Sequence, residues 1–339
     1  MLVDADQGAG MLRFVLRRLI WAIPTLLIVT FLVYVAIRLG TNPAEAYERA
    51  NPRANEAKVQ EYKELNNLTG SYVEGYIGWL TDFLSPLWGG EGWQRSIVGS
   101  REVWPEMKDA MANSLRLGLT ASFIGITVGL SMGIFAALRP GGLRDTAVNT
   151  SAFVAFSVPP YVSAMIFQLV FAVLWSKWFG SSLLPTSGVY PPGQQGFDLG
   201  LMLKHMILPV TVVAIQIIAV YARYMRASLL EVLNSDYMRT ARAKGISERR
   251  VLVNHAVRNS MIPVVTVAAI DIGAILGGLI ITERIFQYPG MGDFFLTAFD
   301  NGDFPQLMPF MVIIVTAVIM FNLLADVSYA WLDPRIRLG

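Results

Sequence analysis

Few side chains in this 339-residue sequence have the types and spacing that catalysis or metal binding requires. The sequence contains no cysteine and only two histidines, so neither disulfides nor a protein-held metal centre is expected. The stretch GLSMG (129–133) matches the G-x-S-x-G pattern of serine hydrolases, but that pattern requires a strand–turn–helix context. Here it lies inside an apolar segment, with Ser131 far from the segment edges where His205 and His255 fall. We therefore predict no hydrolase and no metal site.

Asp271 is the one acidic residue in the otherwise uncharged segment 259–282. A charge inside a membrane is costly, so this side chain is expected to face protein or water and not lipid. It could line a cavity through which a solute passes, or it could be a hydrogen-bonded carboxyl buried between helices. Gln168 and Gln216 are candidates for the same cavity on the same reasoning.

The elements that must position these residues are long apolar segments. Hydrophobic residues make up 54% of the chain and charged residues only 15%, and the mean hydropathy is +0.49. About 20 helical residues cross a hydrocarbon core of roughly 30 Å. Besides 259–282, the segments that lack any charge are 19–37, 117–138, 146–176, 205–222 and 304–325. We predict an all-α integral membrane protein with six transmembrane helices, the third of them broken at SVPPY (157–161) by its two prolines.

The distribution of Lys and Arg predicts which side of the membrane each loop faces. Basic residues concentrate in cytoplasmic loops, and in this chain they concentrate in 1–18, 139–145, 223–258 and 326–339. Both termini are therefore predicted to be cytoplasmic. The acidic loop 283–303 and a long segment after the first span, with expected helices at 55–68 and 72–84, are predicted to lie outside. The first apolar run is too long for a typical signal peptide, so we predict an uncleaved first span.

Glycines recur at helical spacing in two of the predicted spans. Glycine at every fourth position leaves a bare helix face that another helix can approach closely. The second span carries Gly125, Gly129 and Gly133, and the fifth carries Gly273 and Gly277. Together they predict a tightly packed helix bundle.

The segment YMRTARAKGISERR (237–250) lies between two of these apolar spans and is strongly basic. Ser235 or Asp236 can cap a short helix, Gly245 can end it in a left-handed conformation, and Ser247 can cap the next helix. The exposed surface of this element is predicted to carry basic residues interleaved with two alanines: Arg239, Arg242, Lys244, Arg249 and Arg250, with Ala241 and Ala243. Such a surface can rest on anionic lipid headgroups, or it can enter a groove on another protein.

Four ordered motifs resemble those of one transport family. The stretch DYMRTARAKGISERRVLVNHAVRNSMIPVV looks like the cytoplasmic coupling segment of ABC-importer permeases in the dipeptide, oligopeptide and nickel subfamily. Arg239-Thr240-Ala241 stands where the general family has E-A-A ahead of Gly245, and His255-Ala256-Val257-Arg258 replaces its later I-x-L-P. The other matching stretches are LRRLIWAIPTLLIVTFLVYVAIRL (16–39), ITERIFQYPGMG (281–292) and DVSYAWLDPRIR (326–337).

This resemblance implies a pore-forming subunit with the type I ABC importer permease fold, located in a bacterial inner membrane. The residues that it assigns to coupling with an ATPase are Arg239, Thr240, Ala241, Arg242, Ala243, Lys244, Gly245, Ser247 and Arg250. Those that it assigns to an outer rim facing a docked binding protein are Glu283, Tyr288, Pro289, Gly290 and Asp293. The implied units are 1–39 (N-terminus and first span), 40–110 (extracytoplasmic segment), 111–325 (five-helix core with coupling loop 223–258) and 326–339 (cytoplasmic tail).

The resemblance also implies a division of labour between subunits. The sequence has no G-x-x-x-x-G-K-[ST] loop to cradle nucleotide phosphates, so no cofactor is expected here and ATP and Mg belong to partner subunits. The implied partners are a second homologous permease, two ATP-binding subunits, an extracytoplasmic solute-binding protein and membrane lipid, with no nucleic acid. Peptide is the favoured cargo, with nickel and oligosaccharide as alternatives. An ion-coupled secondary transporter is the rival class, although the chain shows no obvious internal repeat and one intramembrane acid.

Overall fold

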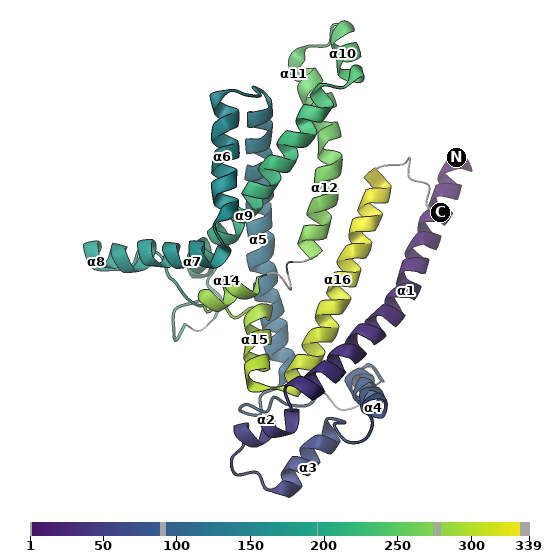
Figure 1. Ribbon diagram of the computed structural model, residues 1–339, viewed down its shortest axis with the longest axis vertical. Coiled ribbons are helices and arrows are strands. Elements are labelled where there is room, and N and C mark those ends of the chain that lie inside the picture. Colours follow the sequence, from purple (N-terminus) through teal and green to yellow (C-terminus); the bar gives the residue numbers. More distant parts are fainter. Residues whose placement is uncertain (1, 89–92, 195, 274, 276–278, 333–339) are drawn as a thin grey trace.

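The computed structural model describes residues 2–88, 93–194, 196–273, 275 and 279–332, and these are almost entirely helical (Figure 1). Within those ranges the only extended pairing is an isolated bridge between Arg95 and Glu102. The helices are α1 (Leu2–Gly40), α2 (Pro43–Ala50), α3 (Glu56–Leu65), α4 (Tyr72–Leu84), α5 (Val103–Ala137), α6 (Leu143–Ser157), α7 (Pro160–Gln168), α8 (Trp175–Phe179), α9 (Leu199–Leu233), α10 (Asp236–Ala243), α11 (Glu248–Arg250), α12 (Arg258–Gly273), α14 (Ile280–Ile285), α15 (Met291–Asn301) and α16 (Phe304–Leu332). Short π-helical segments join α7 to α8 (Leu169–Leu174) and α11 to α12 (Val251–Val257), and a 3₁₀ turn, Ser85–Trp88, follows α4.

Among the described residues, five helical segments are long and apolar enough to cross a membrane. They are Val15–Gly40, Val103–Ala137, Pro160–Phe179, Leu199–Leu233 and Phe304–Leu324. The sixth predicted crossing, 259–282, falls on α12 and continues into positions 274 and 276–278, which lie outside the described residues. Five of the six predicted crossings therefore have a candidate membrane helix, and the described part of the sixth is helical.

The predicted break in the third apolar segment is confirmed, since α6 ends at Ser157 and α7 begins at Pro160. Pro159 has no N–H to donate to the carbonyl of Ala155 four residues earlier. Gln216 on α9 supplies the missing donor, because its Nε2 lies 3.1 Å from that oxygen and 3.0 Å from the carbonyl oxygen of Val158. After the break, α7 and α8 run across the direction of α5 and α6 (Figure 1).

The helices α5 and α9 pack along their length and form the centre of the fold, with α6 and α12 also packed on α9. Figure 1 shows α10 and α11 at one end of this assembly and α2–α4 at the other. The starting end of α1 and the final turns of α16 point towards the α10 end. The membrane-length helices therefore hold the α10–α11 end and the α2–α4 end of the chain apart.

Segment 40–110, which is predicted to be extracytoplasmic, is hydrogen-bonded to the last turns of α1. The expected helices at 55–68 and 72–84 are present as α3 and α4, and α4 begins with a capping box between Ser71 and Glu74. The hydroxyl of Tyr34 donates to the carbonyl of Asn67 at 2.5 Å, and the guanidinium of Arg38 donates to that of Gly70 at 3.1 Å. The helix α5 begins at Val103, before the predicted end of this segment at residue 110, and that boundary stays a prediction.

Candidate functional site

The basic segment 237–250 folds into the exposed element that joins α9 to α12. The short helix α10 begins after Ser235, and Gly245, at φ +73°, adopts the left-handed conformation that glycine tolerates best. The next helix starts after Ser247 and continues without interruption into α12. The hydroxyl of Ser235 donates back to the carbonyl of Val232 at 2.5 Å and does not cap α10.

The two faces of α10 are occupied differently. Met238 is fully buried and Ala241 is 8% exposed, and both pack with Leu229 and Val251 in the chain's own core. Ala241 therefore does not lie on the outer surface as expected, because it anchors α10 to α9 and the following helix. The remaining residues assigned to coupling are exposed: Arg239, Thr240, Arg242, Ala243, Lys244, Gly245, Ser247 and Arg250.

Side-chain contacts brace the turn at Gly245. The guanidinium of Arg242 in α10 forms an ion pair with Glu248 in α11 at 2.9 Å, across the glycine. The amide of Asn259 donates to the Tyr237 hydroxyl at 3.2 Å and so joins α10 to α12. The element is thus a short braced unit attached to two long helices. A force applied to its basic face would reach α9 and α12 together.

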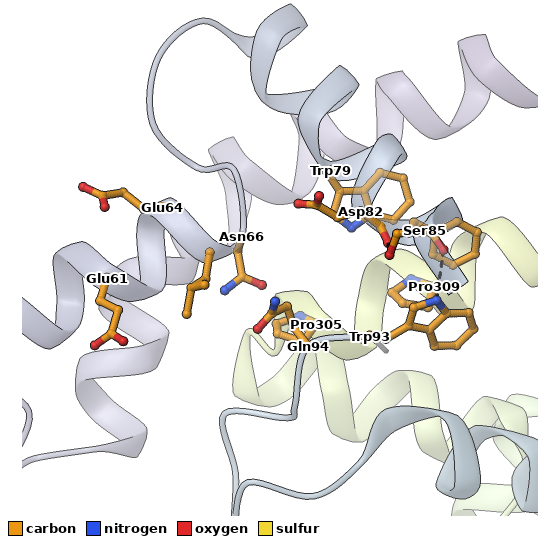
Figure 2. A pocket seen from close by; sticks show the side chains of 12 residues that line it. Glu61, Glu64, Asn66, Trp79, Asp82, Ser85, Trp93, Gln94, Pro305 and Pro309 are labelled. Carbon is orange, nitrogen blue, oxygen red and sulfur yellow. Dashed lines mark hydrogen bonds between the residues drawn. The ribbon is translucent and has the colours of Figure 1, made fainter. Parts of the chain in front are cut away.

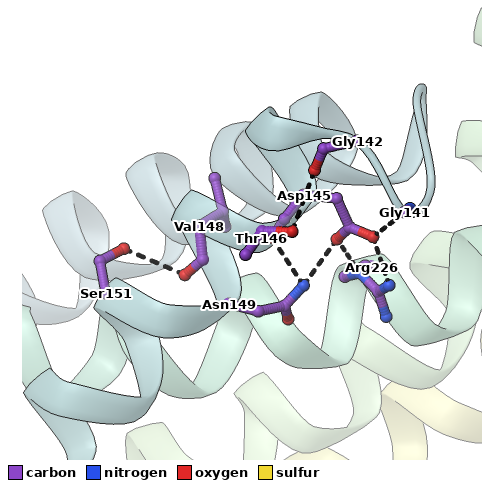
Figure 3. Close-up of polar contacts among 8 residues, drawn as sticks. All are labelled: Gly141, Gly142, Asp145, Thr146, Val148, Asn149, Ser151 and Arg226. Carbon is purple, nitrogen blue, oxygen red and sulfur yellow. Dashed lines mark hydrogen bonds and ion pairs between the residues drawn. The ribbon is translucent and has the colours of Figure 1, made fainter.

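An ion pair that the residue pattern did not predict joins α6 to α9 at the same end of the chain. Asp145 in α6 is 4% exposed and forms a bidentate ion pair with Arg226 in α9 (Figure 3). The Arg226 Nε lies 2.5 Å from Oδ1 and its Nη2 lies 2.7 Å from Oδ2. The Gly141 N–H donates to the same carboxylate at 2.9 Å and the Asn149 amide at 2.6 Å. The hydrogen bond from Arg226 and that from Gly141 lower the pKa of Asp145 to about 2. This pair fixes the start of α6 to the α9 turn that leads towards α10.

Gly125, Gly129 and Gly133 lie where α9 approaches α5 most closely. A Cβ atom at these positions would lie 2.6 Å from Ile217 Cβ, 2.9 Å from Tyr221 Cβ and 2.6 Å from the Ala222 carbonyl oxygen, respectively. Any side chain there would therefore push the two helices apart. Gly118 continues this face towards Ile275. Gly273 is the last described residue of α12, and Gly277 lies outside the described residues.

The three cavity candidates have different environments. Asp271 is exposed, accepts a hydrogen bond from the Tyr221 hydroxyl at 2.7 Å, and lines a pocket of about 190 Å³ between α5, α9 and α12. The Gln216 amide is engaged at the end of α6, as described above. The Gln168 amide donates to the carbonyls of Thr186 and Ile285 at 3.2 and 3.1 Å, so it ties α7 to α14. Of the three, only Asp271 lines the pocket between these helices.

The expected outer rim is more buried than its sequence indicated. Glu283 is 0% exposed, and its carboxylate accepts hydrogen bonds from the Ser114 hydroxyl at 2.5 Å and the Gly292 N–H at 2.7 Å, at the start of α15. Burial raises the pKa of this carboxyl. Glu283 therefore joins α5, α14 and α15, and it is not available to a docked protein, which corrects the expectation.

The other rim residues divide between surface and core. Tyr288 is fully buried, which raises its pKa to about 12, and Gly290 is buried against the Glu283 side chain. Pro289 is exposed, and Asp293 is partly exposed and paired with Arg284 at 3.1 Å. The accessible part of the expected rim thus reduces to Pro289 and Asp293.

Two hollows lie at the end predicted to be extracytoplasmic, opposite α10. One, of about 440 Å³, lies between α3, α4 and the start of α16; aromatic rings (Trp79, Phe83, Trp93) and three carboxylates (Glu61, Glu64, Asp82) contribute to its lining (Figure 2). The Trp93 indole donates to the Phe83 carbonyl at 3.1 Å. The other, of about 560 Å³, lies between the first turns of α5, α15 and the loop containing Tyr190. Both are openings of mixed polar and apolar lining, at the end opposite the basic element.

The catalytic alternatives find no support in the geometry. Ser131 lies inside α5 and donates to the Thr127 carbonyl one turn earlier at 2.8 Å, with no strand before it. His205 is buried with its Nδ1 2.9 Å from the Ser187 carbonyl oxygen. In the described ranges no cluster of three or more His, Asp or Glu side chains could hold a metal ion.

A bundle of apolar helices with a braced basic element at one end and two open hollows at the other is the architecture expected of a membrane transport subunit. The chain belongs to the family of binding-protein-dependent transport system inner membrane components, whose family model matches residues 125–338. It is therefore an inner-membrane permease component and not a catalytic subunit, and ATP hydrolysis and capture of the solute belong to other proteins of the system.

Curated relatives extend the similarity over nearly the whole chain. The oligopeptide transport system permease protein AppB of Bacillus subtilis is 32% identical over 330 residues, covering 96% of this chain and 100% of that protein. The di/tripeptide transport system permease protein DppB of Pseudomonas aeruginosa is 34% identical over 350 residues, covering 96% and 99%. The dipeptide transport system permease protein DppB of Escherichia coli K12 is 32% identical over 349 residues, covering 96% and 99%.

Two solved structures share the fold. A structure of the MetNI methionine ABC transporter in inward-facing conformations superposes with a TM-score of 0.51 at 14% identity, covering 68% of this chain and 97% of that chain. The crystal structure of an amino acid ABC transporter with histidines superposes with a TM-score of 0.50 at 13% identity, covering 67% and 94%. The core has the type I importer permease fold.

Proposed function

We propose that this chain is one of two homologous permease subunits of an ATP-driven importer for dipeptides and oligopeptides. A solute-binding protein delivers the peptide at the outer end, and two ATP-binding subunits act on the α10–α11 element at the other. Names of relatives that transport peptides support the substrate class. ATP and Mg are held by the ATP-binding subunits in this proposal. Both termini lie on the cytoplasmic side with the basic loop 223–258, in accord with its eight Lys and Arg residues.

The observation that carries the coupling role is the division of α10 into an anchored face and a free face. Met238 and Ala241 hold the helix to the core, while Arg239 and Lys244 stay exposed on the other side. An element resting only on lipid headgroups needs positive charge but no internal bracing. The ion pair between Arg242 and Glu248 and the left-handed Gly245 give this element a fixed shape, as an insert for a protein groove requires.

Gly245→Val tests the coupling role. A β-branched residue strongly disfavours the left-handed conformation, so the turn changes shape even though no atom lies within 4 Å of the added Cβ. We expect the complex, reconstituted with its partners, to lose ATP-driven uptake of trialanine while its ATPase activity no longer responds to the loaded binding protein. Gly180→Val is the matched control, since Gly180 has φ +79° and equally open space but lies at the end of α8. Equal uptake in both variants would contradict the coupling role.

The substrate class is tested separately with the unmodified complex. Stimulation of ATP hydrolysis is measured for dialanine, trialanine and pentaalanine, and for a nickel salt and an oligosaccharide as alternatives. Stimulation by peptides alone supports the proposal. Uptake driven by a proton or sodium gradient in liposomes holding only this chain would refute the ATP-driven function.

A further inference from the structure

The helix α5 carries a line of polar residues on the side opposite its contact with α9. Their intervals of three, four and seven residues keep them on one helix face: Asp109, Asn113, Arg116, Thr120, Thr127 and Ser131. We call this face the polar stripe. The other two polar residues in 109–131, Ser114 and Ser122, point elsewhere and are buried.

No helix of the described chain covers the polar stripe. Asp109, Arg116, Thr127 and Ser131 are exposed, and Asn113 and Thr120 are partly exposed. From the first to the last of them the helix rises about 33 Å. Thr120, Thr127 and Ser131 lie within the predicted crossing 117–138, whereas Asp109, Asn113 and Arg116 precede it. Phe123, which is 74% exposed, interrupts this face between Thr120 and Thr127. Within the apolar part of α5 the polar stripe therefore consists of three hydroxyl groups, and its charged groups lie beyond one end.

The outer end of the polar stripe opens into the 560 Å³ hollow. Glu106, which also lines it, is paired with Arg101 at 2.6 Å and accepts a hydrogen bond from the Gln306 amide at 3.1 Å. The Arg116 guanidinium donates to the Asn113 side chain on the same helix at 3.3 Å. Asp109 and Arg116 thus present opposite charges to the hollow, two helical turns apart.

We propose that the polar stripe lines the route along which the transported peptide crosses the membrane, with the hollow as its outer mouth; this rests on the proposed function. A peptide with free ends has an ammonium group suited to Asp109 and a carboxylate suited to Arg116. Seven helical residues span about 10 Å, and three extended peptide residues span about the same. Thr120, Thr127 and Ser131 then supply hydroxyls that exchange hydrogen bonds with any peptide backbone, whatever its side chains.

The pocket at Asp271 is a competing route on another side of α5. Gly118, Ser122 and Ile126 line it, and the surrounding residues are mostly apolar, with Val213 and Ile217 across from them. The polar stripe has more polar groups and spans a greater length of the helix. A substrate path at Asp271 would leave Thr127 and Ser131 out of contact with water, so the water accessibility of these two positions distinguishes the two routes.

Because the chain has no cysteine, single cysteines report the surroundings of each position without further mutation. Thr127→Cys and Ser131→Cys change little in size, and Val128→Cys is the control, since Val128 is 38% exposed beside the stripe. Each variant is assembled with its partners in lipid nanodiscs, cycled with ATP, and treated with a charged, water-soluble methanethiosulfonate. Mass spectrometry of this chain measures labelling, and trialanine uptake in proteoliposomes measures function.

We expect labelling at positions 127 and 131 and not at 128, with uptake by the labelled variants falling at least about tenfold because a charged adduct obstructs the path. Equal labelling at 127 and 128, or full labelling at 127 and 131 with unchanged uptake, overturns the proposal. If the unlabelled wild-type complex takes up no peptide, the proposed function fails. The labelling pattern alone then decides whether the stripe faces water, so the two failures are distinguishable.

The charged mouth is tested by Arg116→Gln and Arg116→Lys. Loss of a hydrogen bond between charged groups corresponds to about a tenfold change in affinity or more. We expect Arg116→Gln to raise the KM for trialanine by about that factor, with the lysine variant in between and ATP hydrolysis intact. An unchanged KM in Arg116→Gln removes Arg116 from the route.

Discussion

On α5, the face that meets α9 and the face turned away from it have opposite chemistry. The first carries Gly125, Gly129 and Gly133 against the α9 backbone, while the second carries hydroxyl, amide and charged groups that no described helix covers. One face is shaped for contact with a known neighbour in the same chain. The other is shaped for a neighbour outside it. One helix can thus pack on its neighbour through one face and line the proposed peptide route with the other.

The largest expected effect comes from filling the packed face with Gly133→Leu. A Cβ there already lies 2.6 Å from the Ala222 carbonyl oxygen and 2.7 Å from Met225 Cβ, and a backbone atom cannot move aside. We expect a loss of about 3 kcal/mol in unfolding free energy and little assembled protein in the membrane. The measurement is the yield and thermal unfolding of the purified complex.

Val128→Leu provides the control for that substitution, because it adds one methylene to the same helix at an exposed position. It should leave yield and unfolding temperature unchanged. Similar losses in both variants would show that α5 tolerates no added bulk on any side, and the contrast between its faces would disappear.

The second effect is expected from Asp145→Asn, which breaks the link between α6 and α9. The ion pair is largely shielded, with side-chain exposures of 5% for Asp145 and 27% for Arg226. Leaving Arg226 without its partner should cost roughly 3 kcal/mol, read as a lower unfolding temperature of the complex. Glu248→Gln is the comparison, because its pair with Arg242 is exposed (73% and 43%) and surface pairs contribute about 0–1 kcal/mol. Equal losses would contradict the assigned burial.

These two predictions also show what the sequence could and could not reveal. The glycine spacing on α5 and the glycine turn at Gly245 are local patterns, so the sequence was enough to predict a close helix approach and a left-handed turn. The partners of Asp145 and Glu283 are 81 and 169 residues away in the chain. No local pattern indicates which distant residue meets a given carboxylate. Glu283 was therefore expected at the surface, although it holds three helices together.

The sequence also does not indicate which face of a short helix is buried. The basic segment 237–250 predicted a short helix, but its length gave no hydrophobic period from which to choose the buried face. Met238 and Ala241 face inward because α9 and the following helix enclose that side, which is a tertiary effect. The polar stripe of α5 spans enough turns for its period to be visible in the sequence. Phe123 and Ile124 interrupt it, and both are exposed, so the polar period is incomplete in the sequence and in the structure.

A smaller effect is expected from Gln216→Ala, which removes two hydrogen bonds at the end of α6. The carbonyls of Ala155 and Val158 would lose donors in a region that lipid cannot hydrate, at a cost of about 1–2 kcal/mol. Amide hydrogen exchange in α6 should increase. Thr211→Ala is the control on the same helix, since its hydroxyl donates only to Ile207 one turn away. No difference in exchange between the two variants would show that Pro159 needs no compensating donor.

The smallest effect concerns Asp303, next to the hollow of about 560 Å³. It is 1% exposed and accepts hydrogen bonds from the Ser96 hydroxyl at 2.5 Å and from the Ile97 N–H at 3.2 Å. Burial raises its pKa to about 6, and the nearby Glu106 adds to the rise. A raised acid pKa means that the folded chain binds a proton more tightly than the unfolded one, so stability is greatest below the ordinary Asp pKa and falls as pH rises to about 6. We therefore expect the complex to unfold at a lower temperature at pH 7 than at pH 5, and Asp303→Asn to reduce this dependence. The exposed Asp300, three residues earlier, is the matched control. If Asp300→Asn removed the pH dependence of stability and Asp303→Asn did not, Asp303 would not be the titrating group.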